Sequence, residues 1–345
     1  MNTVLNYLAQ NWQRLALDPH IDPARLSCVL ATPRFRASSH VIFFVLEQNR
    51  NAPMLVAKVP RLPGDHMRLD REASNLRTAF AARANGFDSI PRVLAYEEFH
   101  QHKLLIETAL HGAPMKPAMV QRRPKPCLEA GLTWLLEFHA ASSNTNANAT
   151  DWFETLITQP IRHFQNLLPP MAEELGWLEE VLGLAETLRA QTFPLVLSHE
   201  DLSHPNILIT EEGRVQVVDW ELAEPNGLPA LDLFFFLTYL AFARHGAGKN
   251  AEHLAAFHEA FFGAHAWAKE HIVRYAECLR VPASALPALF ILCWTRYLIG
   301  LVTRLHEPHE PHAKLDHDTL KWLRHNRYYA LWRHALARRG ELIWQ

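Results

Sequence analysis

The spacing of apolar residues in the first third of the chain predicts a small α+β unit. Residues 4–17 have the spacing of an amphipathic helix, and a second helical stretch covers about 65–85 and ends at Gly86. Five runs rich in Val, Ile, Leu and Phe have the character of strands: 26–32, 40–48, 53–60, 92–98 and 103–108. The order of three strands, one helix and two strands indicates a sheet accompanied by a helix.

Beyond Gly112 the pattern becomes helical, for example over 128–142, 177–190 and much of 231–304. One short β interlude interrupts the helices, with strand-like runs at 206–209 and 214–218 joined by a Glu-Glu-Gly turn. This change predicts an α+β fold with two lobes: a β-rich N-lobe over 1–110 and a mainly helical C-lobe over 111–345.

Composition narrows the class of protein. Apolar residues make up 49% of the 345 residues, which suits a globular chain, and the net charge of −2 shows no excess that would favour nucleic acid or an acidic membrane. Four widely spaced cysteines follow no metal-binding pattern and fit free thiols in a reducing cytosol. We expect a soluble cytoplasmic protein, a monomer or dimer, without a nucleic-acid or membrane partner.

The most apolar window, 283–302, is long enough to cross a bilayer, but Pro287 and Arg296 interrupt it. We interpret it as a buried core helix. The N-terminal segment lacks the unbroken apolar stretch of a signal peptide.

The residues that carry chemistry lie around the β interlude. Asp201, within His199-x-Asp201, begins a loop, and Asn206 follows as the chain enters a strand. The hairpin then returns the chain to Asp219 after an apolar strand. Taken singly, these residues could cap a helix, form a turn and end a strand. Together they offer one carboxylate that can accept a proton and two oxygen ligands suited to Mg²⁺, which is what phosphoryl transfer requires.

This segment resembles the catalytic and metal-binding loops of protein kinases, in the His-x-Asp form of the aminoglycoside phosphotransferases and choline kinases. The resemblance implies a bilobal protein-kinase-like fold in which Asp201 is the catalytic base and Asn206 and Asp219 hold Mg²⁺. His199 is then a structural support, as is Asp232 in the downstream Pro-Ala-Leu-Asp-Leu segment. A Trp-Glu pair after Asp219 replaces the Phe-Gly of protein kinases and favours the small-molecule branch.

The N-lobe contains further matches to this family. Lys58, in Leu-Val-Ala-Lys-Val, ends the third strand, where the fold keeps a lysine that contacts phosphate. Glu72 on the following helix is its expected ion-pair partner. The stretch 104–112 resembles the hinge between lobes, where the backbone carbonyl of Glu107 and the N–H of Ala109 would meet adenine. A lysine in an apolar strand could also simply point to solvent.

The turn between the first two strands departs from the family pattern. Kinase-like proteins often have a glycine-rich turn over the phosphates, whereas residues 31–39 contain no glycine. Ser38 and Ser39 could offer N–H or hydroxyl groups to the phosphates, and Arg34 or Arg36 could add positive charge.

The resemblance implies a kinase that transfers the γ-phosphoryl group of ATP, or another NTP, to a hydroxyl of a small molecule. The acceptor would be a sugar-like metabolite or an aminoglycoside-like compound. Charges over 240–310 are mixed rather than acidic, so we expect a neutral or anionic acceptor and not a polycationic drug.

Two other functions remain open at this stage. A pseudokinase would bind nucleotide without catalysis, and the glycine-free turn is compatible with it. A nucleic-acid-binding protein could use the basic and aromatic residues of 321–339, although we favour an amphipathic last helix with its aromatic residues inward and its arginines outward. The His-rich tract 306–312 could suggest a metal, but its prolines and lack of a closed ligand set favour a surface loop.

Overall fold

The computed structural model describes residues 2–32, 40–62, 64–84, 86–144, 151–306 and 314–344. The chain divides into two compact units. The first unit comprises Met1–Pro114 and Asn206–Ala223, and the second comprises Met115–Pro205 and Glu224–Gln345. An antiparallel sheet dominates the first unit and helices dominate the second, which confirms the predicted fold class.

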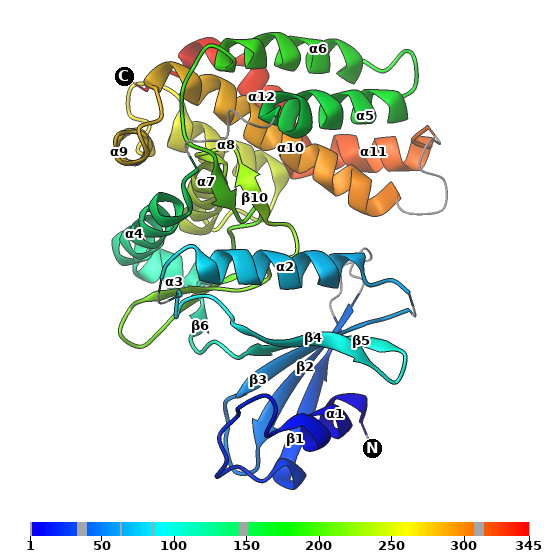
Figure 1. Cartoon of the computed structure of the whole chain (residues 1–345). Helices are drawn as coiled ribbons and strands as arrows, with labels where there is room; N and C mark the ends of the chain where they lie inside the picture. The colour runs from blue at the N-terminus through cyan, green and yellow to red at the C-terminus, as the bar shows by residue number, and fades with distance from the viewer. Residues whose placement is uncertain are drawn as a thin grey trace. The chain divides into compact units, whose positions relative to one another are not determined.

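The first unit is built on a five-stranded antiparallel sheet in the order β1-β2-β3-β5-β4 (Figure 1). Its strands, rich in β-branched and aromatic residues, are β1 (Leu26–Ala31), β2 (His40–Glu47), β3 (Leu55–Pro60), β4 (Val93–Phe99) and β5 (His102–Thr108). They agree with the predicted runs to within two residues at each end. The helix α2 (Met67–Ala81) follows β3.

The two faces of this sheet carry different kinds of side chain. Leu55 and Ala57 of β3, with Leu104 and Ile106 of β5, face a core that is closed by α1 (Thr3–Asn11). Because side chains alternate along a strand, Lys58 projects from the opposite face. The helix α2 packs against β3 and β4. The sheet therefore separates an apolar core from a face that carries charge.

The first helix is shorter than predicted. The apolar spacing indicated a helix over 4–17, but α1 ends at Asn11. The indole N–H of Trp12 donates to the carbonyl of Asp18 at 3.0 Å, and Ala16 adopts a positive φ of 49°. Tertiary packing of the tryptophan thus turns the chain before the helical spacing runs out.

A second small sheet completes the first unit. It contains β6 (Ala113–Pro114), β8 (Ile207–Ile209) and β9 (Val215–Val217) in the order β6-β8-β9. Gly213, with a φ of +82°, supplies the left-handed residue that the turn between β8 and β9 needs. The segment 206–223 is therefore part of the first compact unit, whereas the predicted lobes of 1–110 and 111–345 assign it to the second.

The second unit is helical, and one short antiparallel pair of strands, β7 (Val196–Ser198) and β10 (Glu224–Gly227), lies among the helices. Short 3₁₀ and π turns accompany the longer elements. The helices are α3 (Pro117–Arg122), α4 (Pro124–Ser142), α5 (Gln159–Leu167), α6 (Glu174–Ala185), α7 (Leu231–His245), α8 (Asn250–Phe261), α9 (Lys269–Leu279), α10 (Leu286–His306), α11 (His317–His325) and α12 (Arg327–Ala337).

Aromatic side chains fill the core of the second unit. The ring of Phe290 in α10 lies 5.0 Å from that of Phe234 in α7 and stacks on Phe257 of α8 at 5.6 Å. Within the described residues, 283–305 is the segment long and apolar enough to span a membrane, and 78% of its most apolar window is buried inside the protein. Such burial is typical of a core helix.

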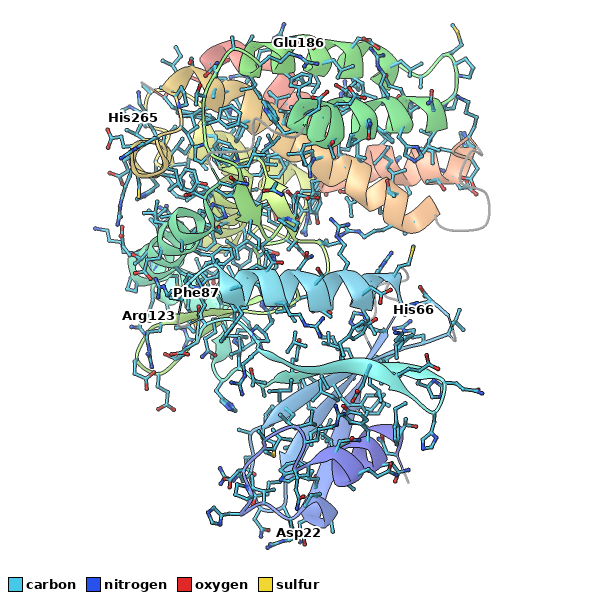
Figure 2. All side chains as sticks on the ribbon, viewed as in Figure 1. Asp22, His66, Phe87, Arg123, Glu186 and His265 are labelled. Atoms are coloured by element: carbon cyan, nitrogen blue, oxygen red, sulfur yellow. The ribbon has the colours of Figure 1, made fainter. Side chains whose placement is uncertain are left out.

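The basic C-terminal helices are amphipathic. In α12, Tyr329 and Trp332 are buried, whereas Arg333 is exposed. Arg324 of α11 forms a two-pronged ion pair with Glu174 of α6, at 2.8 and 2.9 Å. The aromatic residues Tyr329 and Trp332 therefore pack within the unit, and the basic residues of these helices lie toward its surface. Charged side chains elsewhere, such as those of Asp22, Arg123 and Glu186, lie on the outside (Figure 2).

Two helical glycines provide a matched test of packing in the second unit. A Cβ added at Gly131 of α4 would lie 2.1 Å from the ring of Phe236 in α7, whereas one at Gly183 of α6 would meet nothing within 4 Å. Gly131→Ala should lower the free energy of unfolding by about 1–3 kcal/mol through overpacking. Gly183→Ala should raise it by about 0.5–1 kcal/mol through helix propensity. Urea denaturation measures both, and equal effects would contradict the packing.

Candidate active site

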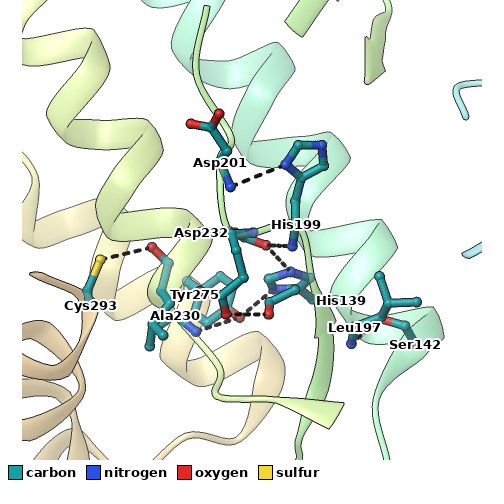
Figure 3. Close-up of polar contacts among 12 residues, drawn as sticks. His139, Ser142, Leu197, His199, Asp201, Ala230, Asp232, Tyr275 and Cys293 are labelled. Carbon is teal, nitrogen blue, oxygen red and sulfur yellow. Dashed lines mark hydrogen bonds and ion pairs between the residues drawn. The ribbon is translucent and has the colours of Figure 1, made fainter. Parts of the chain in front are cut away.

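Asp232, in the first turn of α7, holds the backbone of the segment that contains Asp201 (Figure 3). Its carboxylate accepts hydrogen bonds from the backbone N–H groups of His199 at 2.6 Å and Glu200 at 2.8 Å. It also lies 3.2 Å from Nε2 of His139 in α4. Because an ionised carboxylate only accepts, His139 donates from Nε2. Three donors from two segments therefore converge on one buried side chain.

A second layer of hydrogen bonds supports Asp232. With its Nε2 donating, His139 accepts at Nδ1 from the hydroxyl of Tyr275 in α9, at 2.7 Å. The same hydroxyl accepts the backbone N–H of Ala230 at 3.0 Å. Burial alone would raise the pKa of Asp232, but the hydrogen bond from His139 and the nearby charges and amides hold it below its ordinary value. Asp232 is thus an ionised acceptor at neutral pH.

The backbone of this segment is in an uncommon conformation. Glu200 has a φ of 64° and Ala230 a φ of 67°, in the left-handed region that residues other than glycine rarely adopt. Such residues persist where the surroundings fix them, and they cluster at functional sites. Here the Glu200 N–H is fixed by Asp232, and its carboxylate accepts from the Ser198 hydroxyl at 2.8 Å.

Asp201 itself is partly exposed. Its backbone N–H donates to Nδ1 of His199 at 3.3 Å, and its carboxylate points away from Asp232 (Figure 3). Tyr297 of α10 and Tyr328 of α12 lie near it, with ring centres 4.4 Å apart. Burial raises the pKa of both tyrosines, and the charge of Asp201 adds to that effect. The carboxylate is therefore presented beside an aromatic surface within the second unit.

Asn206 and Asp219, the predicted metal ligands, flank the open end of the β8–β9 hairpin in the first unit. The N–H of Val218 donates to the carbonyl of Asn206 at 3.0 Å, which brings the two ends of the hairpin together. Asp219 has a φ of 69°. The following residue, Trp220, is buried, and its backbone N–H donates to the carboxylate of Glu72 at 3.3 Å. The chain around Asp219 is thus tied to α2.

Lys58 and Glu72 form the ion pair that the sequence predicted. Both side chains are buried. Burial would lower the pKa of Lys58, but the carboxylates of Glu107, Glu72 and Asp219 outweigh it and raise this pKa above its ordinary value. The lysine is therefore charged in a buried position and is held beside Asp219.

In the structure, the two residues that were predicted to contact adenine from the hinge make contacts within the protein. The Ala109 N–H, which was expected to meet adenine, donates to the carbonyl of Met54 at 3.2 Å. Glu107 was predicted to act through its backbone, yet its side chain is buried with an oxygen 3.5 Å from Lys58 Nζ. Ser38, Ser39, Arg34 and Arg36 lie outside the described residues.

Two further residues of the first unit escaped the sequence analysis. His40, at the start of β2, is buried, and its Nδ1 lies 3.8 Å from a carboxylate oxygen of Glu221. Burial and the charge of Lys58 lower the pKa of His40 to about 4, so its ring is neutral at physiological pH. Burial and the charge of Asp219 raise the pKa of Glu221 to about 7. In the sequence, the position of His40 directly after the glycine-free turn of residues 31–39 could have marked it as a candidate site residue.

The donor set around Asp219 suits Mg²⁺. Amide and carboxylate oxygens are its preferred protein ligands, and the carboxylates near Lys58 leave negative charge for a cation to offset. The described part of the chain contains no group of three or more His, Cys, Asp or Glu side chains arranged to hold a metal alone.

Comparison with known proteins identifies the class. The pattern of the phosphotransferase enzyme family matches residues 34–271, more than half of the chain. The chain belongs to this family, which confirms the recognition made from its motifs. No curated protein sequence matches significantly.

Solved structures share the protein-kinase-like fold. The GDP complex of aminoglycoside 2'-phosphotransferase-IIIa is 15% identical with a TM-score of 0.55, over 98% of this chain and 99% of that one. A putative fructosamine-3-kinase from Haemophilus somnus 129PT is 12% identical with a TM-score of 0.53, over 98% and 96%. Choline kinase LicA from Streptococcus pneumoniae is 13% identical with a TM-score of 0.51, over 90% and 94%. At these identities the likeness establishes the fold alone.

Asp232→Asn should test the hydrogen-bond hub. The new amide would turn an NH₂ group toward N–H donors, which should cost about 2–4 kcal/mol of unfolding free energy. Because the folded pKa of Asp232 is lowered, the loss should be full at neutral pH and should shrink only below the ordinary aspartate pKa of about 3.9.

Chemical denaturation at several pH values measures this effect. Glu129→Gln, which removes an exposed carboxylate 2.9 Å from Arg274, is the matched control and should cost less than about 1 kcal/mol. Similar losses of unfolding free energy in the two variants would show that Asp232 stabilises the protein no more than an exposed carboxylate does.

Proposed function

We propose that this chain is a small-molecule kinase that transfers the γ-phosphoryl group of ATP to a hydroxyl group of its acceptor, with Mg²⁺. The observation that carries the proposal is the buried Asp232, which fixes the backbone at His199 and Glu200 and leaves the neighbouring Asp201 partly exposed. Family membership supports the reaction class.

In this proposal Asp201 orients the acceptor hydroxyl and takes its proton. The acceptor oxygen forms a bond to the γ-phosphorus, the bond between that phosphorus and the bridging oxygen breaks, and ADP leaves. Lys58, aligned by Glu72, binds the phosphates, and Asn206 with Asp219 would hold Mg²⁺, which offsets phosphate charge when bound. Only four residues separate Asp201 from Asn206.

The surroundings of Asp201 support a neutral or anionic acceptor with a ring. Tyr297 and Tyr328, both partly buried, lie near it, and their aromatic rings suit the apolar face of a sugar. Arg296 of α10 lies 3.5 Å from Glu200, and Arg304 acts electrostatically on Tyr297. Positive charge on this helix disfavours a polycation.

Asp201→Ala should lower turnover by about two to four orders of magnitude, as loss of a positioned base does. Nucleotide affinity should change little, because no phosphate contact is assigned to this carboxylate. Steady-state kinetics with coupled ADP detection and calorimetric titration with ATP measure the two quantities. Near-normal turnover in the folded variant would refute the assigned role.

The acceptor class predicts a preference among substrates. A panel of neutral sugars, sugar acids and kanamycin should give at least one sugar or sugar acid with a kcat/KM more than about tenfold above that of kanamycin. The value for kanamycin should lie below about 10⁴ M⁻¹s⁻¹, the lower end of typical enzymes. Kanamycin as the best substrate of the panel would reverse this assignment.

A further inference from the structure

Glu107 places a second carboxylate on the ammonium group of Lys58. Side chains alternate along β5, so Leu104 and Ile106 enter the core beside α1 while Glu107 projects from the other face. Its Oε1 lies 3.5 Å from Nζ of Lys58, which also forms the ion pair with Glu72. The side chains of Glu107, Lys58 and Glu72 are 4%, 6% and 1% exposed. Two buried carboxylates therefore share one ammonium group.

Burial raises the pKa of Glu107 to about 7, so it is above neutral pH that the lysine does not balance the negative charge around it. Asp219 acts electrostatically on Lys58 and Glu107, and Glu221 interacts with Asp219 and Glu72. The cluster thus contains four carboxyl groups around one buried ammonium. The Oε2 atoms of Glu72, Glu107 and Glu221 are buried and have no hydrogen-bond partner among the residues that the structure describes. Buried oxygens in this state need a cation or a donor.

The other basic groups near the cluster do not remove the imbalance. His40, at the start of β2, is neutral because burial and Lys58 lower its pKa. Arg68, in the first turn of α2, is partly exposed, and Arg61 after β3 is exposed, so water screens both. Among the residues that the structure describes, the face of the sheet that carries Lys58 is therefore electronegative above neutral pH despite its lysine.

The negative charge on this face opposes the binding of an anionic ligand. Buried charges interact more strongly than exposed ones, so a polyphosphate approaching Lys58 is repelled by each ionised carboxylate behind it. If Glu107 only held Lys58 in place, Glu72 would already suffice, since it forms the closer ion pair. The second carboxylate adds negative charge that the lysine cannot offset.

We propose that Glu107 is a specificity-determining residue that makes nucleotide binding depend on a divalent cation. Its carboxylate disfavours metal-free nucleotide at Lys58, whereas a nucleotide carrying Mg²⁺ brings positive charge that offsets the repulsion. The inference rests on the proposed function, because it takes Lys58 as the phosphate contact and Asp219 as a ligand of the ion.

The test is the coupling between Mg²⁺ and nucleotide, measured as binding and not as activity. Calorimetric titration with ATP gives the dissociation constant in MgCl₂ and in EDTA, at mildly alkaline pH where carboxyl groups are ionised. In Glu107→Gln, the ratio of the EDTA constant to the MgCl₂ constant should fall at least about tenfold. Most of the change should come from tighter binding of metal-free ATP, because a repulsive charge is lost.

Three further variants serve as controls for the effect of Glu107→Gln. Glu98→Gln removes an exposed carboxylate from β4 of the same sheet and should leave the ratio unchanged. Glu107→Asp keeps the charge and should retain the coupling, which also guards against a folding defect in the glutamine variant. Asp219→Asn should reduce the ratio by the opposite route, through weaker binding of Mg²⁺-ATP.

The outcomes separate this inference from the function on which it rests. Equal weakening of both constants in Glu107→Gln would make Glu107 a structural residue, and an unchanged ratio would show that Glu107 does not contribute to the coupling. Either result overturns the inference while the kinase proposal stands. A wild-type protein that binds ATP in neither buffer would overturn both.

Discussion

The second unit depends on the ionised state of one buried carboxylate. Isolated, an aspartate at the position of Asp232 would be expensive to ionise, because burial removes its water. The fold supplies two backbone N–H groups from the 199–200 segment and an imidazole from α4 in place of that water. The same contacts that stabilise Asp232 force Glu200 into the left-handed region. The conformation that presents Asp201 is therefore stabilised by hydrogen bonds to Asp232, not by the local preferences of the loop.

The first unit contains a different arrangement of buried charges. There the buried charge is a lysine with more carboxylates than it can neutralise, so the protein alone does not complete the network. Asp232 is saturated by donors from its own unit, whereas Glu72, Glu107 and Glu221 each retain a buried oxygen without a partner among the described residues. A saturated site keeps one geometry, and an unsaturated one is suited to receive a charged ligand.

Much of this organisation could be predicted from the sequence because it depends on local order. Strand positions followed from runs of β-branched residues, and the Lys58–Glu72 pair followed from motif order. The end of α1 could not be predicted, because it depends on the contact of the Trp12 indole with the Asp18 carbonyl. The roles of His139 and Tyr275 could not be predicted either, since His139 reaches Asp232, and Tyr275 reaches His139, from helices distant in the chain. Glu107 was assigned a backbone role, and only the strand pairing reveals that its side chain shares a face with Lys58.

The division of the chain explains why the motif is so compact. The boundary between the two units passes between Pro205 and Asn206, so the proposed base and the first proposed metal ligand belong to different units. Packing within either unit can position only its own member of that pair. Four intervening residues are what connects the two members directly. A longer loop would let base and ligand move more independently, since the conformational freedom of a connection grows with its length. The short spacing of the motif is thus a covalent constraint that neither hydrophobic core could supply.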